Sequence, residues 1–215
     1  MLDGPRIPPA GGGKPKNLVV FLHGYGANGD DLIGIGREWA PALPATAFVS
    51  PNAPQLCAGA PMGRQWFPLT MRDPHEFARG VAAARPGLDA FLDAELSRHG
   101  LDESRCALVG FSQGTMLALH AGLLRGRRFA GILGFSGLLA DPTALKAGPV
   151  QKPPILLIHG DRDDLIPVAA IFSAAQGLAA AEIPVEWHIS PGIPLGIGPD
   201  GLELGLAFLR RTLPR

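Results

Sequence analysis

The sequence predicts a single α/β domain with a mostly parallel, doubly wound sheet flanked by helices. Short apolar runs alternate along the chain with helical patterns, and most of these runs are continuous rather than alternating. Continuous apolar runs are typical of strands that are covered on both faces. The length of 215 residues suits one domain, and a hydrophobic content of 47% is enough for a sizeable core.

The expected strands lie at residues 18–23, 47–50, 106–111, 131–135, 155–159 and 185–189. The last run alternates apolar and polar residues, which places it nearer an edge of the sheet. Helical spacing predicts helices within 77–96, 113–124, 168–181 and 201–213. Pro86 is expected to start or kink the first of these helices. Residues 1–16, rich in Pro and Gly, are expected to form an extended or mobile lead-in to a domain spanning 17–215.

The composition argues against several classes of function. The net charge is zero, which gives no indication of a nucleic-acid surface. No apolar run approaches the length of a membrane span, and the first residues lack the apolar core of a signal peptide, so a cytoplasmic location is expected. Cys57 and Cys106 are expected to be reduced structural thiols. No metal and no nucleotide cofactor are expected, since the corresponding motifs are absent from the sequence.

The strongest chemical signal is GFSQG at residues 110–114, which matches G-x-S-x-G. It follows a predicted strand and precedes a predicted helix, which is the context of a nucleophile elbow. The hydroxyl of Ser112 would then be exposed above the sheet. The backbone N–H of Gln113 would point the same way, at the positive end of the helix. A chance glycine-rich turn is the alternative, and the strand and helix on either side argue against it.

A second glycine-rich loop, LHGYGANGD at residues 22–30, comes at the end of the strand predicted at 18–23. Such a loop can lend a second backbone N–H to an oxyanion, and Tyr25 is the candidate donor. His23 precedes the serine in the chain, so we expect a buried residue that braces the loop rather than a catalytic base. Asn28 and Asp30 are expected to cap the helix that follows.

A third motif, HGDRDDLIP at residues 159–167, follows the predicted strand at 155–159. An aspartate at such a strand end can hold a histidine through its Nδ1–H, as the acid of a catalytic triad does. Asp161, Asp163 and Asp164 all compete for this role. Two of the three are expected to be solvated or to cap a helix.

The motifs LHGYGANGDDL, GFSQG and HGDRDDLIP, in this order, resemble the carboxylesterase/acyl-protein thioesterase group of the α/β-hydrolases, also called the phospholipase/carboxylesterase family. The resemblance covers the chain from about Asn17 to Leu213. It implies the α/β-hydrolase fold without a large cap, and activity on carboxyl esters or thioesters. It further implies that Ser112 is the nucleophile, that Asp163 is the triad acid, and that Tyr25 and Gln113 donate to the oxyanion.

The resemblance also concerns the substrate pocket. The segment with Met62, Gln65, Trp66 and Phe67 matches the part of the family that lines the acyl pocket. A segment packed for stability is the alternative interpretation. One position of the third motif departs from the family, which more often has Pro where this chain has Asp164.

A larger departure lies after the last predicted strand, where the family has its triad histidine in a G-x-x-H turn. This chain has GIPL at residues 192–195, with Leu195 at the histidine position. Chain order in this fold is Ser, Asp, His, and His188 alone among the histidines follows Asp163. His188 lies seven residues before Leu195 in mid-strand. Seven strand residues span roughly 23 Å, so His188 is not expected to be the base.

The sequence therefore predicts an esterase with an intact nucleophile at Ser112 and a proton relay interrupted at Leu195. The expected partner is a small-molecule acyl ester or thioester. The alternative is a non-catalytic acyl-binding pseudo-enzyme on the same fold. Recent loss of the histidine, natural or engineered, fits the otherwise intact motifs, and the sequence leaves a homodimer open.

Overall fold

The structure, a computed structural model, describes residues 2–57, 60–70, 72–73 and 75–215. Its strands are β1 (Arg6–Ile7), β2 (Asn17–Leu22), β3 (Thr46–Val49), β4 (Gln55–Cys57), β5 (Ala60–Gln65), β6 (Cys106–Phe111), β7 (Gly131–Phe135), β8 (Ile155–Gly160) and β9 (Glu186–Ser190). Its α-helices are α1 (Gly29–Trp39), α2 (Glu76–His99), α3 (Gln113–Leu124), α4 (Ala169–Ala179) and α5 (Pro199–Thr212).

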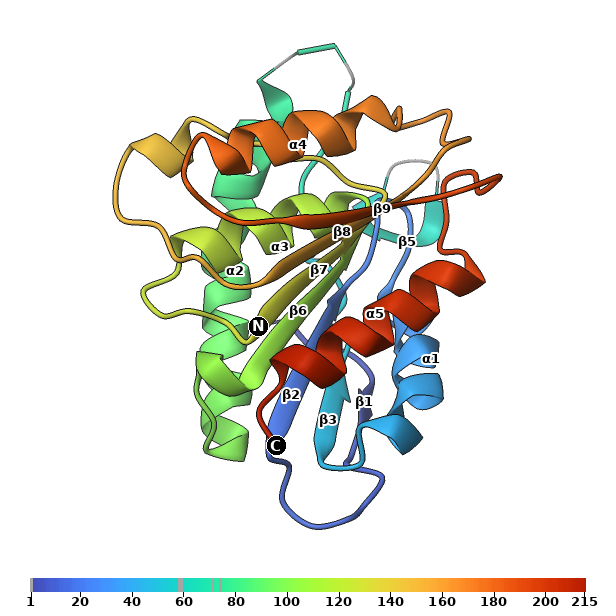
Figure 1. Cartoon of the computed structure of the whole chain (residues 1–215), viewed down its shortest axis with the longest axis vertical. Coiled ribbons are helices and arrows are strands. Elements are labelled where there is room, and N and C mark those ends of the chain that lie inside the picture. Colours follow the sequence, from blue (N-terminus) through green and yellow to red (C-terminus); the bar gives the residue numbers. More distant parts are fainter. Residues whose placement is uncertain (1, 58–59, 71, 74) are drawn as a thin grey trace.

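The main sheet has the strand order β1-β3-β2-β6-β7-β8-β9 (Figure 1). β1 runs antiparallel to β3, and the other neighbouring strands of this sheet are parallel. β9 is the last strand at one edge, as its alternating pattern predicts. The predicted α/β-hydrolase architecture is confirmed, and the carboxyl ends of β2, β6, β7, β8 and β9 lie at one end of the sheet.

The central strands are buried on both faces because their side chains alternate between two apolar clusters. In β2, Leu18, Val20 and Leu22 pack into the first cluster, with residues of α2, α3 and α4. Val19 and Phe21 pack into the second cluster, with residues of α1 and α5. Successive side chains of a strand point to opposite faces, and here both faces are covered by helices. Most residues of such a strand are therefore apolar, which gives a continuous apolar run in the sequence.

The start of α1 agrees with its predicted capping residue, whereas the start of α2 differs from the prediction. The side chain of Asn28 accepts the N–H of Asp30 at 2.8 Å, and Asp31 accepts the N–H of Asn28 at 2.7 Å, which forms a capping box at the start of α1. The expected cap at Asn28 is confirmed. α2 does not begin at Pro86, because the helix starts at Glu76 and continues past the proline.

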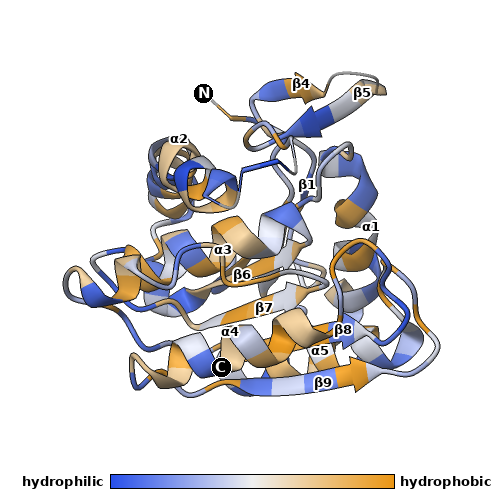
Figure 2. Cartoon of the chain, turned by 90° about the horizontal axis from the view of Figure 1, so that it is seen from above, coloured by the Kyte–Doolittle hydropathy of each residue, from blue (hydrophilic) through white to orange (hydrophobic). Residues whose placement is uncertain are grey.

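Two elements were not predicted. Arg6 and Ile7 pair with Val49 and Phe48 as an added edge strand, so the first residues pack on the sheet. The antiparallel pair β4–β5 forms a separate small sheet, which Figure 2 shows set apart from β6–β9. Within the described part of the chain, none of the helices is both long and apolar enough to cross a membrane.

Candidate active site

Ser112 lies in the turn between β6 and α3, with φ 51° and ψ −115°. A non-glycine residue with positive φ is strained, and such strain is typical of functional turns. A Cβ on Gly114 would lie 1.8 Å from the carbonyl oxygen of Leu22, and a Cβ on Gly110 would lie 2.5 Å from the Thr115 backbone. Both glycines of the motif are therefore required by close backbone approach, as a nucleophile elbow predicts.

The loop after β2 lies directly beside this turn. A Cβ on Gly24 would be 3.4 Å from the Cβ of Ser112. Neither Tyr25 nor Gln113 donates its backbone N–H to a hydrogen bond within the described residues. Both backbone N–H groups are therefore available to an acceptor, which is one requirement of an oxyanion hole.

His23 is buried below this loop, and its hydrogen bonds define its tautomer. Ala53 donates its backbone N–H to Nε2 at 2.9 Å, so Nε2 carries no proton. Nδ1 then donates to the carbonyl oxygen of Gly24 at 2.8 Å. Burial lowers the pKa of His23, which keeps the ring neutral. Both ring nitrogens are thus engaged in holding the loop.

The side chain of Gln113 connects the elbow to the segment after β5. Its Oε1 accepts the N–H of Trp66 and its Nε2 donates to the carbonyl oxygen of Phe67, both at 2.8 Å. Trp66 and Phe67 are each only 2% exposed and belong to the first apolar cluster. Met62, by contrast, is 81% exposed. The predicted pocket segment therefore contains two core residues and one surface residue.

Two grooves of about 590 and 600 Å³ run beside α2, and Trp66 lines both of them. Phe67 lines the second groove. Ser112 is part of neither lining among the described residues. Trp66 also contacts the loop after β2, because its indole N–H donates to the carbonyl oxygen of His23 at 2.9 Å.

The three aspartates after β8 have different surroundings. Asp163 is buried, with a side chain that is 0% exposed, whereas Asp161 and Asp164 are exposed. Asp161 accepts the backbone N–H of Gly192 at 2.6 Å, so it ties the two loops together. Burial distinguishes Asp163 as the carboxylate that could act inside a site.

One oxygen of Asp163 is fully bonded and the other is not. Oδ1 accepts the backbone N–H groups of Leu165 at 3.0 Å and Ile166 at 2.9 Å. Oδ2 is buried without a hydrogen-bond donor among the described residues. Nε2 of His159 lies 3.4 Å from Oδ2, but it donates to the carbonyl oxygen of Ile166 at 2.8 Å. A single N–H cannot satisfy both acceptors well, and the shorter contact is to the carbonyl.

The loop that carries Leu195 rests on the turn that carries Asp163. Arg162 donates its backbone N–H to the carbonyl oxygen of Ile193 at 3.0 Å. A Cβ on Gly160 would lie 2.2 Å from the same carbonyl oxygen. Leu195 itself is 38% exposed.

On its other side, the same loop is held over the end of β7 by Ser136, a residue that the sequence analysis missed. The hydroxyl of Ser136 donates to the carbonyl oxygen of Gly196 at 3.3 Å. Ser136 is buried and has a positive φ of 46°. Ser112 donates its N–H to the carbonyl oxygen of Phe135, the residue before Ser136. Position 195 is therefore bracketed by contacts to the β8 turn and to the strand beside Ser112.

His188 is engaged elsewhere. Its Nε2 lies 2.8 Å from Oδ2 of Asp200, at the start of α5. Burial alone would raise the pKa of Asp200, but the hydrogen bond with His188 helps to leave that pKa below its usual value. His188 lies opposite Ile158 in the sheet, and Ile158 packs into the cluster with α1 and α5. His188 therefore faces α5.

The model of the family described as "Phospholipase/Carboxylesterase" matches residues 7–212. The chain belongs to this family. Among its phospholipase/carboxylesterase relatives, acyl-protein thioesterase 1 of Gibberella zeae is 28% identical over 213 residues, covering 91% of this chain and 90% of that protein. Esterase YpfH of Escherichia coli is 29% identical over 206 residues, covering 94% and 86%. The crystal structure of esterase PE8 is similar with a TM-score of 0.94, 44% identity and 99% coverage of both chains.

Proposed function

We propose that this chain is a serine carboxylesterase of its family, acting on carboxyl esters or thioesters through an acyl-enzyme at Ser112. We further propose that Leu195 occupies the position of the general base, so that turnover is strongly impaired. The observation that carries the proposal is the bracketing of position 195 between the Asp163 turn and the strand beside Ser112. Relatives named as esterases and acyl-protein thioesterases support this substrate class.

In the proposed reaction, Oγ of Ser112 attacks the carbonyl carbon of the substrate. The free N–H groups of Tyr25 and Gln113 then hold the oxyanion that forms. The first helical turn of α3 adds the positive end of its dipole. Asp163, kept in place by two backbone N–H groups, would orient an imidazole if one were present.

Leucine at 195 removes the proton acceptor from this arrangement. A serine hydroxyl is a weak nucleophile unless a base takes its proton. In another serine hydrolase, loss of the triad histidine reduces kcat by about 10⁶-fold, and the oxyanion hole and substrate binding preserve a residual activity. The same pattern is expected here.

The direct test is Leu195→His, assayed with an activated aryl ester. We expect kcat to rise on the order of 10²–10⁴-fold or more, because a positioned general base contributes at least this much. The double variant Ser112→Ala, Leu195→His is the matched control and should lose the gain. A correctly folded Leu195→His protein with no gain would refute the proposed function.

The grooves beside Trp66 favour one second candidate, a non-catalytic acyl-binding protein on the same fold. It requires fatty-acyl binding near Trp66 and no ester turnover above buffer. Turnover by the unaltered chain that Ser112→Ala abolishes would exclude this candidate.

A further inference from the structure

The unbonded carboxylate oxygen at Asp163 has a consequence for what the site can bind. Burying a carboxylate oxygen without a hydrogen-bond donor destabilises the folded protein, and the loss is larger for a charged group than for a neutral one. The two backbone N–H groups on Oδ1 fix the orientation of the carboxylate. Oδ2 of Asp163 is thus a preformed acceptor for an N–H donor.

We propose that Oδ2 of Asp163 binds the N–H of an imidazole-class base that comes from outside the chain, and that this base replaces the missing triad histidine in activating Ser112. The inference rests on the proposed function, since it needs Ser112 as nucleophile. An imidazole fits this chemistry because one ring nitrogen donates to a carboxylate while the other accepts a proton.

Oδ2 of Asp163 is buried, so an external base needs a route to it. Leu195 is 38% exposed, and displacement of its side chain is the route that the proposal requires. On one side of position 195, the carbonyl oxygen of Ile193 accepts the N–H of Arg162, next to Asp163. On the other side, Gly196 is bonded to Ser136. Ser136 follows Phe135, whose carbonyl oxygen accepts the N–H of Ser112. In the proposal, a small ring displaces the side chain of Leu195 and contacts both the Asp163 carboxylate and the Ser112 hydroxyl.

The chemical steps balance without any further reactant. The proton of the Ser112 hydroxyl moves to the unprotonated ring nitrogen as the Oγ–C bond forms and the carbonyl electron pair moves to oxygen. The imidazolium returns that proton to the leaving oxygen or sulfur as its bond to carbon breaks. Water then attacks the acyl-enzyme in the same way, and the imidazole is released unchanged.

The first arm of the test adds free imidazole to the unaltered chain and to Leu195→Ala, with an aryl acetate as substrate. Ser112→Ala under the same conditions measures hydrolysis by imidazole in solution, which is subtracted. We expect a saturable, Ser112-dependent increase of about tenfold or more in both proteins, larger in Leu195→Ala, as part of the contribution of a positioned base. An increase confined to Leu195→Ala would overturn the inference for the chain as it stands.

The second arm tests the contact with Asp163. N-methylimidazole keeps a basic ring nitrogen but has no N–H to donate. We expect it to rescue the unaltered chain much less than imidazole does, and we expect Asp163→Asn to remove this difference. Equal rescue by the two bases in the unaltered chain would overturn the assignment of Oδ2, whatever the stability of the Asp163 variant.

The third arm distinguishes a free base from one that the substrate carries. Aryl esters of N-acylated histidine and N-acylated phenylalanine are compared without added base, after subtraction of the Ser112→Ala rate. A preference for the histidine ester assigns the base to the substrate, and rescue by free imidazole alone assigns it to solution. If Leu195→His is active but neither source gives a Ser112-dependent gain, this inference is wrong and the proposed function stands. An inactive Leu195→His chain would instead remove both.

Discussion

At the scale of single residues, Gly114 shows how closely the backbone is packed around the proposed nucleophile. A Cβ there would meet the carbonyl oxygen of Leu22 at 1.8 Å, so β2 and α3 would have to separate. We predict that Gly114→Ala destabilises the protein by about 3 kcal/mol, because overpacking at rigid backbone has no relaxed solution. Urea unfolding measures the change.

The matched control is Gly34→Ala, in the exposed part of α1, where an added Cβ meets nothing within 4 Å. Alanine is a better helix former than glycine, so this variant should be as stable as the parent or up to about 1 kcal/mol more stable. Equal unfolding midpoints for the two variants would contradict the packing argument.

Residues also differ in how well the sequence predicted them. Ser112 was predictable because its motif is local in sequence. An added Cβ on Gly110 would meet the Thr115 backbone of the same turn, whereas one on Gly114 would meet Leu22 of β2. Asp163 was chosen among three aspartates by resemblance, while its burial comes from contacts that sequence does not show. Ser136 was missed because a serine after a strand has no distinguishing pattern, and its bond to Gly196 depends on how β7 and the 191–198 loop meet.

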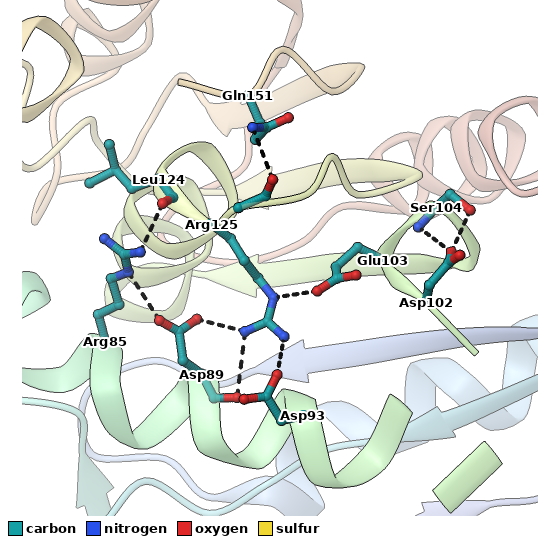
Figure 3. A network of polar contacts seen from close by, with 10 residues as sticks. Arg85, Asp89, Asp93, Asp102, Glu103, Ser104, Leu124, Arg125 and Gln151 are labelled. Atoms are coloured by element: carbon teal, nitrogen blue, oxygen red, sulfur yellow. Dashed lines mark hydrogen bonds and ion pairs between the residues drawn. The ribbon is translucent and has the colours of Figure 1, made fainter. Parts of the chain in front are cut away.

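At the scale of elements, a polar network joins α2 to the end of α3 (Figure 3). Arg125 bonds Glu103 at 2.8 Å and Asp89 at 2.9 Å, and it also pairs with Asp93. Arg85 adds a bond to the carbonyl oxygen of Leu124 at 2.8 Å. The side chain of Arg125 is only 10% exposed, so these partners, rather than water, compensate its positive charge.

We predict that Arg125→Met destabilises the protein by about 3 kcal/mol, because it leaves Glu103 without this cation and leaves Asp89 with Arg85 alone. Lys152→Met is the control, since the pair of Lys152 with Glu182 is 44% and 88% exposed. Such a surface pair contributes less than about 1 kcal/mol. Similar losses of thermal stability in both variants would refute a special role of the network.

The elements that the sequence analysis missed share one physical feature, which is that neither has an apolar pattern of its own. β1 is two residues long and has no periodicity of its own, and it exists because β3 offers a free edge. The pair β4–β5 has an irregular register and little apolar alternation. The continuous apolar strands and the long helices, by contrast, carry their burial pattern in their own residues.

At the scale of the whole molecule, buried histidines link stability to pH. Burial is the first cause that lowers the pKa of His23, His99 and His120. The unfolded chain therefore binds more protons than the folded chain below about pH 6.5, the ordinary value for histidine. Stability rises with pH wherever the unfolded state binds more protons, so it must fall as the pH is lowered through this range.

We predict that the free energy of unfolding decreases between pH 7 and pH 5, and that His120→Leu makes this decrease smaller. Carboxyl groups with lowered pKa values, such as Asp200, lose their charge only below about pH 4, outside this window. Urea titrations at several pH values measure the slope. A slope that is the same in the parent and in His120→Leu would contradict the prediction for this residue.

The short strand β1 also covers an edge at which the main sheet could pair with another chain. β3 is buried along its whole length, and without β1 its outer edge would present unpaired N–H and C=O groups beside apolar side chains. Arg6 anchors the cover through a two-point ion pair with Glu95 at 3.2 and 2.7 Å. Proteolytic removal of the first eight residues would thus turn a sealed sheet edge into a template for aggregation.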